Sequence, residues 1–414
     1  MKKIQMALIV LAVILGSNSL ALNAQVPVPD AAAPSTAPPI PAAPQLGANS
    51  YILVDFNSDR ILVEHNADLP VEPASITKLM TAYVVFGELE QGNIKLEDLV
   101  PVSERAWRTG GSRMFIDPSM QVTVEDLIRG MVIQSGNDAS VALAEYVAGS
   151  EEAFASLMNH FAEQLGMSNT HFMNSTGLPD PEHYTTARDI AVLSAATIRH
   201  FPDYYAWYSE KEFTFNGIRQ HNRNTLLWRD PAIDGLKTGH TESAGYCLAA
   251  SAMRDGMRLV SAVMGSGSET SRASESQTLL NFGFRFFETV QLYQAGTELA
   301  TARVWKGLSE EVALGVNAPL FVTIPRGRYD ELEAQVQLDP QLSAPLEAGQ
   351  VVGMINVQLG DELIASRDLV TLNAVEEAGF FGRSWDGLKL WMNGLFGDTD
   401  EDAARDDTQK PNDE

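Results

Sequence analysis

The sequence has one cysteine and few basic side chains for its length. Its 414 residues include 29 Lys or Arg against 54 Asp or Glu, which gives a formal net charge of -25. So little basic charge cannot follow a phosphate backbone, and this excludes a nucleic-acid partner. A single cysteine cannot form an internal disulfide bond. Cys247, inside the apolar run GYCLAASAM, is therefore expected to be a small buried side chain.

Metal-binding patterns are also missing. The seven histidines are scattered, and neither HExxH nor HxxEH occurs. The absence of these motifs argues against a zinc carboxypeptidase, and the sequence implies no metal and no other cofactor.

The N-terminus predicts a secretory signal peptide. Two lysines precede an apolar run over residues 6–15, which is too short to cross a bilayer comfortably. Cleavage after Ala21 would use small residues at both recognition positions, whereas cleavage after Ala24 leaves a leucine at the outer one. We take residues 1–24 as the signal peptide, with an uncleaved anchor as the less favoured alternative. The protein is expected to be exported.

Composition divides the rest of the chain into a linker and two domains. Residues 25–45 are rich in Pro and Ala, which is typical of a linker. Residues 46–289 combine a hairpin, several helices and three closely spaced strands, which indicates an α/β domain with an antiparallel sheet flanked by helices. Residues 290–375 contain short strands, Gly and Pro turns and no long helix, which predicts a small all-β domain.

Local signals predict individual elements of the larger domain. The stretch EFTFNGIRQ alternates around Asn-Gly and predicts a hairpin. Thr123 with Asp126, and Thr186 with Asp189, are typical of capping boxes. Helices are expected near residues 75–86, 123–131, 138 onward, 151–165, 187–200 and 271–287.

The stretch PASITKLMT places a serine three residues before a lysine at the start of a helix. Lys78 stands where the helix dipole disfavours a cation, on the same face as Ser75. A serine hydroxyl needs a group that takes its proton, and lysine can do so only as a neutral amine. Burial, neighbouring cations and a helix N-terminus all lower the pKa of a lysine. We therefore predict Ser75 as nucleophile and Lys78 as its base; alone, the motif would favour a solvated lysine.

Two further tripeptides favour the catalytic interpretation. SGN at residues 135–137 lies between two helices, and KTG at residues 237–239 opens a strand pair. The ordered set S-x-x-K, S-x-N and K-T-G within one exported domain indicates serine acyl transfer of the penicillin-recognising type.

These tripeptides supply further candidate site residues. Ser135 can relay a proton to a leaving amine, and Asn137 can hold Lys78 and a substrate amide. Lys237 can lower the pKa of Lys78 and bind a substrate carboxylate, and Thr238 adds a hydroxyl donor.

The end of KTG has a separate expected role. Gly239 allows a substrate backbone to approach closely, and the N–H of His240 can pair with that of Ser75 as an oxyanion hole. For the His240 side chain, a packed or solvent-facing position and a catalytic one are both open.

The chain resembles the low-molecular-mass penicillin-binding proteins, specifically the D-alanyl-D-alanine carboxypeptidases of the penicillin-binding-protein-5/6 type. The similarity runs from about residue 46 to residue 396. It includes PASITKLMT, LIRGMVIQSGNDA, NTHF, KEFTFNGIRQHNRNTLLW, DGLKTGHTESAGY, GFRFFETV and TIPRGR.

This resemblance implies a transpeptidase-like fold and a set of roles. Ser75 would form the acyl ester, Lys78 would accept its proton, and Ser135 would relay it. Lys237 would contact the substrate carboxylate, and Arg272 matches a family arginine near the site. The stretch AWRTGGSRMF is shorter than the family's usual loop, which bears on substrate preference and deacylation.

A class A β-lactamase shares the three motifs. Its deacylating glutamate stands in E-x-x-L-N, which EFTFN at residues 212–216 superficially resembles. The match is rejected because the stretch lies too far after SGN and reads as a hairpin.

Residues 376–397 predict an amphipathic helix. FFGRSWDGLKLWMNGLF places apolar side chains at four- and three-residue steps and contains two of the six Trp residues. We expect it to lie in the membrane surface, with packing on the β domain as the alternative. Residues 398–414 carry eight acidic and two basic residues and are expected to form a disordered tail.

Together with these features, the resemblance implies a serine D-Ala-D-Ala carboxypeptidase on the periplasmic face of the inner membrane. It would remove the terminal D-alanine from peptidoglycan stem pentapeptides and bind β-lactam antibiotics covalently. Two alternatives stay open: an endopeptidase of the same fold, and a penicillin-sensing envelope protein with vestigial catalysis. The intact motifs argue against the second.

Overall fold

The computed structural model describes residues 22–29, 40–339 and 341–379. They form two compact units. Within the described residues, the larger unit comprises residues 40–290 and 321–329, and the smaller comprises residues 22–29, 291–320 and 330–379.

The larger unit is built on a five-stranded sheet with the strand order β3-β2-β10-β9-β8. Every neighbouring pair is antiparallel, which confirms the predicted N-terminal hairpin and the three closely linked strands. The strands are β2 (Ser50–Asp55), β3 (Ile61–His65), β8 (Ile233–Thr241), β9 (Gly245–Arg254) and β10 (Met257–Ser266).

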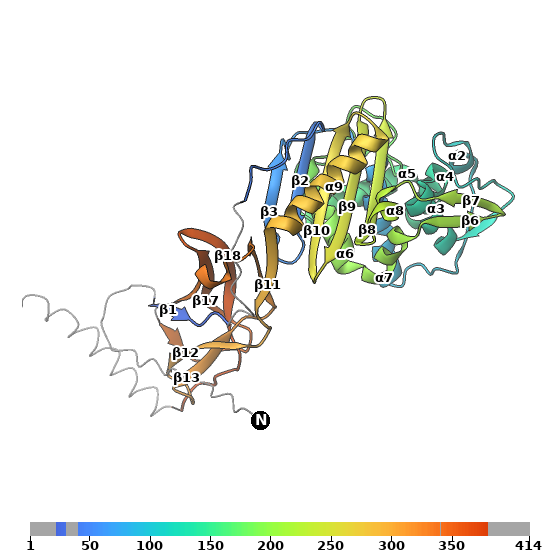
Figure 1. Cartoon of the computed structure of the whole chain (residues 1–414). Coiled ribbons are helices and arrows are strands. Elements are labelled where there is room, and N and C mark those ends of the chain that lie inside the picture. Colours follow the sequence, from blue (N-terminus) through green and yellow to red (C-terminus); the bar gives the residue numbers. More distant parts are fainter. Residues whose placement is uncertain (1–21, 30–39, 340, 380–414) are drawn as a thin grey trace, which may run out of the picture. The chain divides into compact units, whose positions relative to one another are not determined.

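Helices cover both faces of this sheet (Figure 1). Helix α9 (Glu269–Phe286) packs on one face, and α6 (Ala187–His200) packs on the other. Successive side chains of β10 alternate between two cores: Leu259 lies in the core beneath α9, and Val260 lies in the core on the opposite face. This is the two-residue period of a strand. Burial on both faces explains why the strands read as continuous apolar runs.

Helix α1 (Lys78–Glu90) is the centre of the helical part. Every residue from Lys78 to Gly87 is buried, and the helix packs against several other helices of this unit. The other elements here are η1 (Ala74–Thr77), β4 (Leu99–Pro101), α2 (Glu104–Arg108), β5 (Gln121–Thr123), α3 (Val124–Gln134), α4 (Asn137–Ala148), α5 (Glu151–Gln164), α7 (Pro202–Tyr205), η2 (Ala206–Ser209) and α8 (Leu226–Arg229).

Local signals in the sequence are confirmed at several helix starts and one turn. The Thr123 hydroxyl accepts from the N–H of Asp126, and the Thr186 hydroxyl accepts from that of Asp189. Strands β6 (Glu212–Phe215) and β7 (Ile218–His221) form the predicted hairpin, with positive φ at both turn residues, Asn216 and Gly217. EFTFN is therefore a strand and turn, which agrees with rejecting the class A match.

The smaller unit is all-β, as predicted, and contains a seven-stranded sheet ordered β1-β15-β17-β18-β13-β12-β16. Its strands are β1 (Leu22–Val26), β12 (Glu298–Trp305), β13 (Glu311–Gly315), β15 (Leu332–Leu338), β16 (Leu342–Ser343), β17 (Val351–Leu359) and β18 (Glu362–Thr371). A short helix, η3 (Tyr329–Glu331), precedes β15. Strands β11 (Phe287–Tyr293) and β14 (Leu320–Pro325) form a two-stranded sheet, most of whose residues belong to the larger unit.

The chain passes between the units more often than a single boundary near residue 290 implies. Residues 321–329, expected in the β domain, belong to the larger unit. Thr323 explains this placement: its hydroxyl lies 2.6 Å from Ser58 Oγ and 2.9 Å from Thr289 Oγ1. In the other direction, β1 pairs with β15, although its residues span the expected signal–linker junction.

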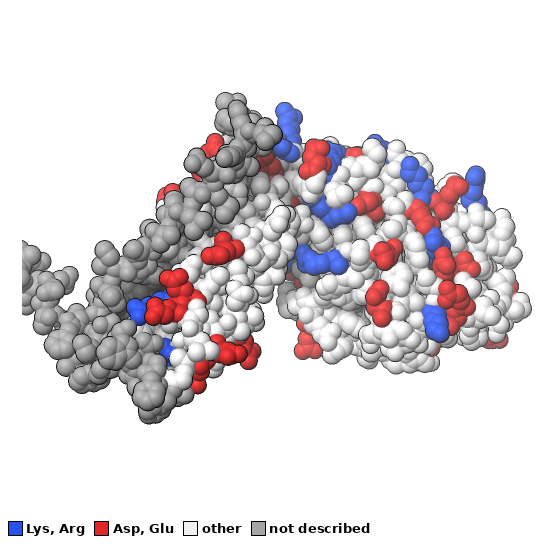
Figure 2. Space-filling model, turned by 90° about the horizontal axis from the view of Figure 1, so that it is seen from below, with Lys and Arg blue, Asp and Glu red and all other residues white. Residues whose placement is uncertain are grey.

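Several sequence predictions lie outside the described residues. They concern residues 1–21, most of the expected C-terminal helix and the acidic tail. In the part of the chain that the structure does describe, no helix is both long and apolar enough to cross a membrane. On the face shown in Figure 2, acidic and basic side chains are interspersed over the surface.

Candidate active site

Ser75 and Lys78 lie together at the junction of η1 and α1. Ser75 belongs to η1, and Lys78 is the first residue of α1. The Lys78 ammonium nitrogen Nζ donates to Ser75 Oγ at 3.0 Å and to the carbonyl oxygen of Thr176 at 2.6 Å. Lys78 is completely buried.

Burial determines the protonation of Lys78. It lowers the pKa of the amine from 10.5 to about 7, while the negative charges of Asp138 and Glu151 raise it. Near neutral pH, a large fraction of Lys78 is therefore the free amine, which can accept a proton. Neighbouring cations were also expected to lower this pKa, but the charges that act most on Lys78 are acidic.

The backbone at Ser75 is constrained from two sides. Ala74 has φ +48°, a region that non-glycine residues rarely occupy. Gly177 faces it so closely that an added Cβ would lie 1.7 Å from the Ala74 carbonyl oxygen. On the other side, a Cβ at Gly239 would lie 2.9 Å from the Pro73 carbonyl oxygen.

The close contact at Gly239 changes the reason for that glycine. Gly239 was expected to make room for a substrate backbone. In the structure, the group that lies against it is the turn that carries Ser75. Through this contact, β8 packs against η1 at Gly239. The N–H of the next residue, His240, therefore lies near the turn that carries Ser75. The His240 side chain is exposed and packs on Tyr246, with ring centroids 4.0 Å apart.

Ser135 and Lys237 form a second buried pair. Ser135 ends α3 in the left-handed conformation with φ +69°. Lys237 Nζ donates to Ser135 Oγ at 2.9 Å and to the carbonyl oxygen of its neighbour Thr238 at 3.1 Å. Burial, with the charges of Lys78, Arg272 and Arg223, holds the pKa of Lys237 well below its usual range.

Asn137 does not hold Lys78, contrary to the expectation. Its Nδ2 donates to the Gly110 carbonyl at 2.7 Å, and within the described part of the chain its buried Oδ1 has no hydrogen-bond partner. The loop between α2 and β5 lies close to this amide, since an added Cβ at Gly111 would lie 2.6 Å from that Nδ2. The loop therefore binds Asn137 through its amide nitrogen, and Oδ1 has no partner among the described residues.

Arg272 supports the site from behind β8. It is 6% exposed and donates to the carbonyl oxygens of Gly239 and Arg223, both at 3.4 Å. It also pairs with Glu269 at 3.3 Å. Arg272 is thus close to KTG, but it contacts the backbone of the site.

Sequence reasoning missed three groups. Thr176 contributes only its backbone carbonyl to Lys78, so no side-chain pattern reveals it. Asp138 accepts from the N–H groups of Met114, Phe115 and Ile116 at 2.9–3.3 Å and so fixes the loop beside Asn137. The exposed Arg223 acts electrostatically on Lys237. It lies in NRNTLL, part of a stretch that carries the family resemblance, and that position could have marked it as a candidate site residue.

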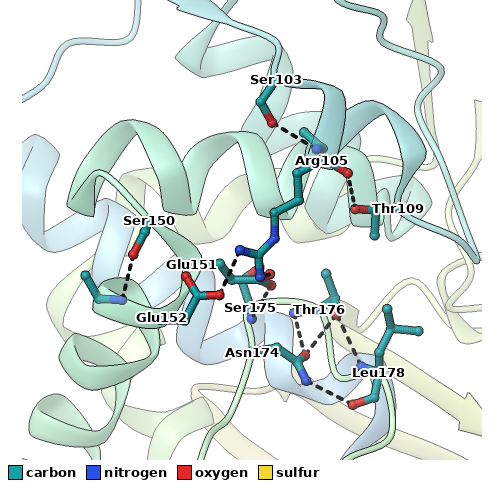
Figure 3. Close-up of polar contacts among 12 residues, drawn as sticks. Ser103, Arg105, Thr109, Ser150, Glu151, Glu152, Asn174, Ser175, Thr176 and Leu178 are labelled. Carbon is teal, nitrogen blue, oxygen red and sulfur yellow. Dashed lines mark hydrogen bonds and ion pairs between the residues drawn. The ribbon is translucent and has the colours of Figure 1, made fainter.

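Figure 3 shows how the Thr176 segment is held. Asn174 Oδ1 accepts from the N–H groups of Thr176 and Gly177, and Glu151 accepts from Ser175. The Thr176 carbonyl that accepts from Lys78 therefore belongs to a short loop that several hydrogen bonds hold in place.

The single cysteine is not prepared to act as a nucleophile. The pKa of Cys247 is raised to about 11 by burial, so its thiol is not ionised at neutral pH. Among the residues that the structure describes, no group of three or more His, Cys, Asp or Glu is placed to hold a metal ion. What the site offers is a hydroxyl beside a buried amine, next to a second buried amine and two arginines.

Comparisons with known proteins agree with this chemistry. The family model for D-alanyl-D-alanine carboxypeptidase matches residues 37–268, and the model for the penicillin-binding protein 5 C-terminal domain matches residues 287–377. The D-alanyl-D-alanine carboxypeptidase DacA of Escherichia coli strain K12 is 49% identical over 366 residues, which cover 86% of this chain and 91% of DacA.

Solved structures give the same picture. Penicillin-binding protein 5 from Haemophilus influenzae is 46% identical and superimposes with a TM-score of 0.79, covering 81% of this chain and 99% of that one. Penicillin-binding protein D2 from Listeria monocytogenes, solved in its ampicillin-bound form, is 30% identical with a TM-score of 0.54. It covers 58% of this chain and 98% of its own.

Proposed function

The chain belongs to the D-alanyl-D-alanine carboxypeptidase family of serine hydrolases, and we propose that Ser75 is the nucleophile with which it removes the terminal D-alanine of peptidoglycan stem pentapeptides. The observation that carries this proposal is the 3.0 Å contact between Ser75 Oγ and a fully buried Lys78 amine whose pKa is about 7. A serine with such a base beside it is an activated nucleophile.

In the first half of the reaction, Ser75 Oγ attacks the carbonyl carbon between the two D-alanines. The neutral Lys78 amine takes the hydroxyl proton as the C–O bond forms. The N–H groups of Ser75 and His240 stabilise the developing oxyanion. The C–N bond then breaks, and the proton that Lys78 took is passed through Ser135 to the amine of the departing D-alanine, which leaves Lys78 neutral again.

The substrate carboxylate binds beside the second lysine. Lys237, Arg223 and the hydroxyl of Thr238 provide donors and positive charge, while Arg272 holds the strand beneath them. The unpaired Oδ1 of Asn137 accepts from a substrate amide N–H. In the second half, Lys78 takes a proton from the water that attacks the acyl ester, and returns it to Ser75 Oγ as the ester bond breaks.

The same acylation accounts for β-lactam binding. Attack of Ser75 on the lactam carbonyl opens the ring, and the amine produced stays attached to the acyl group. A penicillin adduct therefore persists when water reaches the ester slowly.

The direct test is D-alanine release from a pentapeptide ending in D-Ala-D-Ala, followed by mass spectrometry. Release that disappears in Ser75→Ala supports the proposal. Release only from cross-linked dimers would favour an endopeptidase. Full function of Ser75→Ala in a deletion strain would favour the penicillin-sensing alternative.

We also propose that the protein is exported and attached to the periplasmic face of the inner membrane by the helix expected at residues 376–397. For the signal peptide, strand β1 supports cleavage after Ala21, because cleavage after Ala24 would remove three of its five residues. N-terminal sequencing of the processed protein distinguishes the two sites. Deletion of residues 377–396 should release the protein from the membrane fraction; unchanged association would refute the anchor.

A further inference from the structure

The carbonyl oxygen of Thr176 is one of two hydrogen-bond acceptors of Lys78 Nζ, at 2.6 Å. Its position depends on the segment from Asn174 to Gly177, which is not part of any of the three motifs. Asn174 Oδ1 closes this segment into a turn by accepting from Thr176 N, Thr176 Oγ1 and Gly177 N at 2.8–3.1 Å. The turn therefore moves as one piece, and whatever holds its neighbour Ser175 places the carbonyl on Lys78.

Glu151 holds Ser175 from one side. Its Oε1 accepts from Ser175 N at 3.0 Å and from Ser175 Oγ at 2.7 Å (Figure 3). Glu151 is the first residue of α5 and only 6% exposed. Its other oxygen pairs with Arg105 NH2 at 2.7 Å. The arginine also pairs with the exposed neighbour Glu152, so Arg105 joins α2 to the start of α5.

Thr81 holds Ser175 from the other side. Its hydroxyl donates to the Ser175 carbonyl oxygen at 2.7 Å, and Thr81 lies about one turn after Lys78 on α1. Ser175 is completely buried between these contacts. Its N–H, hydroxyl and carbonyl all have partners, so the following residue has little freedom to move its own carbonyl.

We propose that Glu151 is a positioning residue for Lys78, fixing the Thr176 carbonyl through Ser175 and maintaining a negative charge near the amine. This inference rests on the proposed role of Lys78 as base. A buried carboxylate is unfavourable unless it is paired and hydrogen-bonded. The Arg105 side chain is 49% exposed, so the ion pair alone contributes little stability. The interactions that offset the burial of the carboxylate are therefore mainly its hydrogen bonds to Ser175.

Charge and position are separable effects of Glu151. The titratable groups that face Lys78 are Asp138 on α4, Glu151 on α5, Lys237 on β8 and His183, and the two whose charges act most on its amine are Asp138 and Glu151. Both acids favour the protonated amine. Removing the charge of Glu151 therefore makes Lys78 easier to deprotonate, whereas moving the carbonyl weakens the geometry of proton transfer.

Three substitutions separate these effects. Glu151→Gln keeps an oxygen that can accept from Ser175 but removes the charge, and Glu151→Ala removes both. Thr81→Val loosens Ser175 without changing any charge. Glu152→Gln is the matched control, because it breaks an Arg105 ion pair of similar length and has no bond to Ser175. Each full-length variant is compared with the parent chain in its rate of acylation by a labelled penicillin across pH.

The rate should rise with pH as Lys78 loses its proton and then level off. In Glu151→Gln, we expect the acylation rate to rise at lower pH than in the parental protein and to reach a near-parental plateau. Thr81→Val should lower the plateau by roughly tenfold, since small misplacements of catalytic groups have large effects, and leave the pH of the rise unchanged. Glu151→Ala should show both changes, and Glu152→Gln neither. Recovery of the plateau in Glu151→Gln relative to Glu151→Ala distinguishes positioning from a loss of folding.

Two results would overturn the inference. One is a Glu151→Ala plateau that equals the parental plateau, because positioning through Ser175 would then have no effect on the reaction. The other is an equal shift in Glu152→Gln. Failure of the parental protein to be acylated at Ser75 would instead refute the proposed function, so the two failures are distinguishable.

Discussion

Lys237 Nζ donates a hydrogen bond to Ser135 Oγ across 2.9 Å, so the second and third motifs meet through one buried contact. Burial and three nearby cations disfavour a charged Lys237 in the free protein. A bound carboxylate supplies the missing negative charge and restores the ammonium form. Recognition of the substrate carboxylate is thereby linked to the serine that passes a proton to the leaving amine.

The first prediction concerns this carboxylate. Lys237→Gln should lower kcat/KM for a D-Ala-D-Ala peptide by roughly 10–100-fold, the range expected for a lost charge-assisted hydrogen bond. Steady-state kinetics with a peptide whose C-terminus is amidated provides the control. The parental enzyme should lose most of its advantage over Lys237→Gln on that peptide. An equal deficit on both peptides would mean that Lys237 does not contact the carboxylate.

The second prediction links activity to stability at Lys78. The pKa of this lysine is about 7 in the folded protein and near 10.5 when unfolded, so the unfolded state binds more protons between these values. Stability should therefore rise with pH across this window, and burying the lysine costs stability at neutral pH. Lys78→Met should abolish acylation while raising the Tm at pH 7.

Thermal unfolding of the parental protein and Lys78→Met at pH 7 and pH 9.5 tests this. The difference in Tm should shrink at the higher pH, because removing the proton that the unfolded lysine carries then costs less free energy. A lower Tm for Lys78→Met at pH 7 would show instead that its hydrogen bonds to Ser75 and Thr176 outweigh the burial of the amine.

Much of the fold and the motif chemistry was predictable because it depends on local sequence. Capping by Thr123 and the Asn216-Gly217 turn involve neighbours, and the spacing from Ser75 to Lys78 is fixed by helical geometry. The orientation of Asn137 and the approach of Pro73 to Gly239 depend on segments distant in the chain. The Thr176 carbonyl was invisible for another reason, since every residue type has one.

The third prediction concerns Asp138 and the loop beside the site. Its carboxylate accepts three N–H groups of residues 114–116, and an amide has only one oxygen to do so. Asp138→Asn should destabilise the protein by about 1–3 kcal/mol, the range for leaving a buried donor unpaired. Hydrogen exchange followed by mass spectrometry should show faster exchange at residues 110–116.

Asp126→Asn is the matched control for this prediction. It makes the same change of charge at the first turn of α3, where the carboxylate accepts from the Thr123 hydroxyl. Its effect on exchange should stay near that helix end. Faster exchange at residues 110–116 in both variants would point to general destabilisation.

The fourth prediction concerns acid sensitivity through His183. This histidine is 3% exposed, its Nδ1 accepts from Met173 N at 3.1 Å, and Nε2 therefore donates to Thr77 Oγ1 at 2.8 Å. Thr77 lies between Ser75 and Lys78, so His183 supports the turn that carries the nucleophile. Burial lowers the pKa of the imidazole from 6.5 to about 4, which keeps it neutral.

The sign of the resulting pH dependence follows from the lowered pKa. Between pH 6.5 and pH 4 the unfolded histidine is protonated while the folded one is not, so stability falls as the pH falls. Across the whole window the loss approaches about 3 kcal/mol. His183→Gln should be less stable than the parental protein at pH 7.5 but should lose less stability between pH 7.5 and pH 5. Urea unfolding at both values measures the difference, with the exposed His160→Gln as control. If His183→Gln and the parental protein lose the same stability over this range, His183 is not the group that makes the fold acid-sensitive.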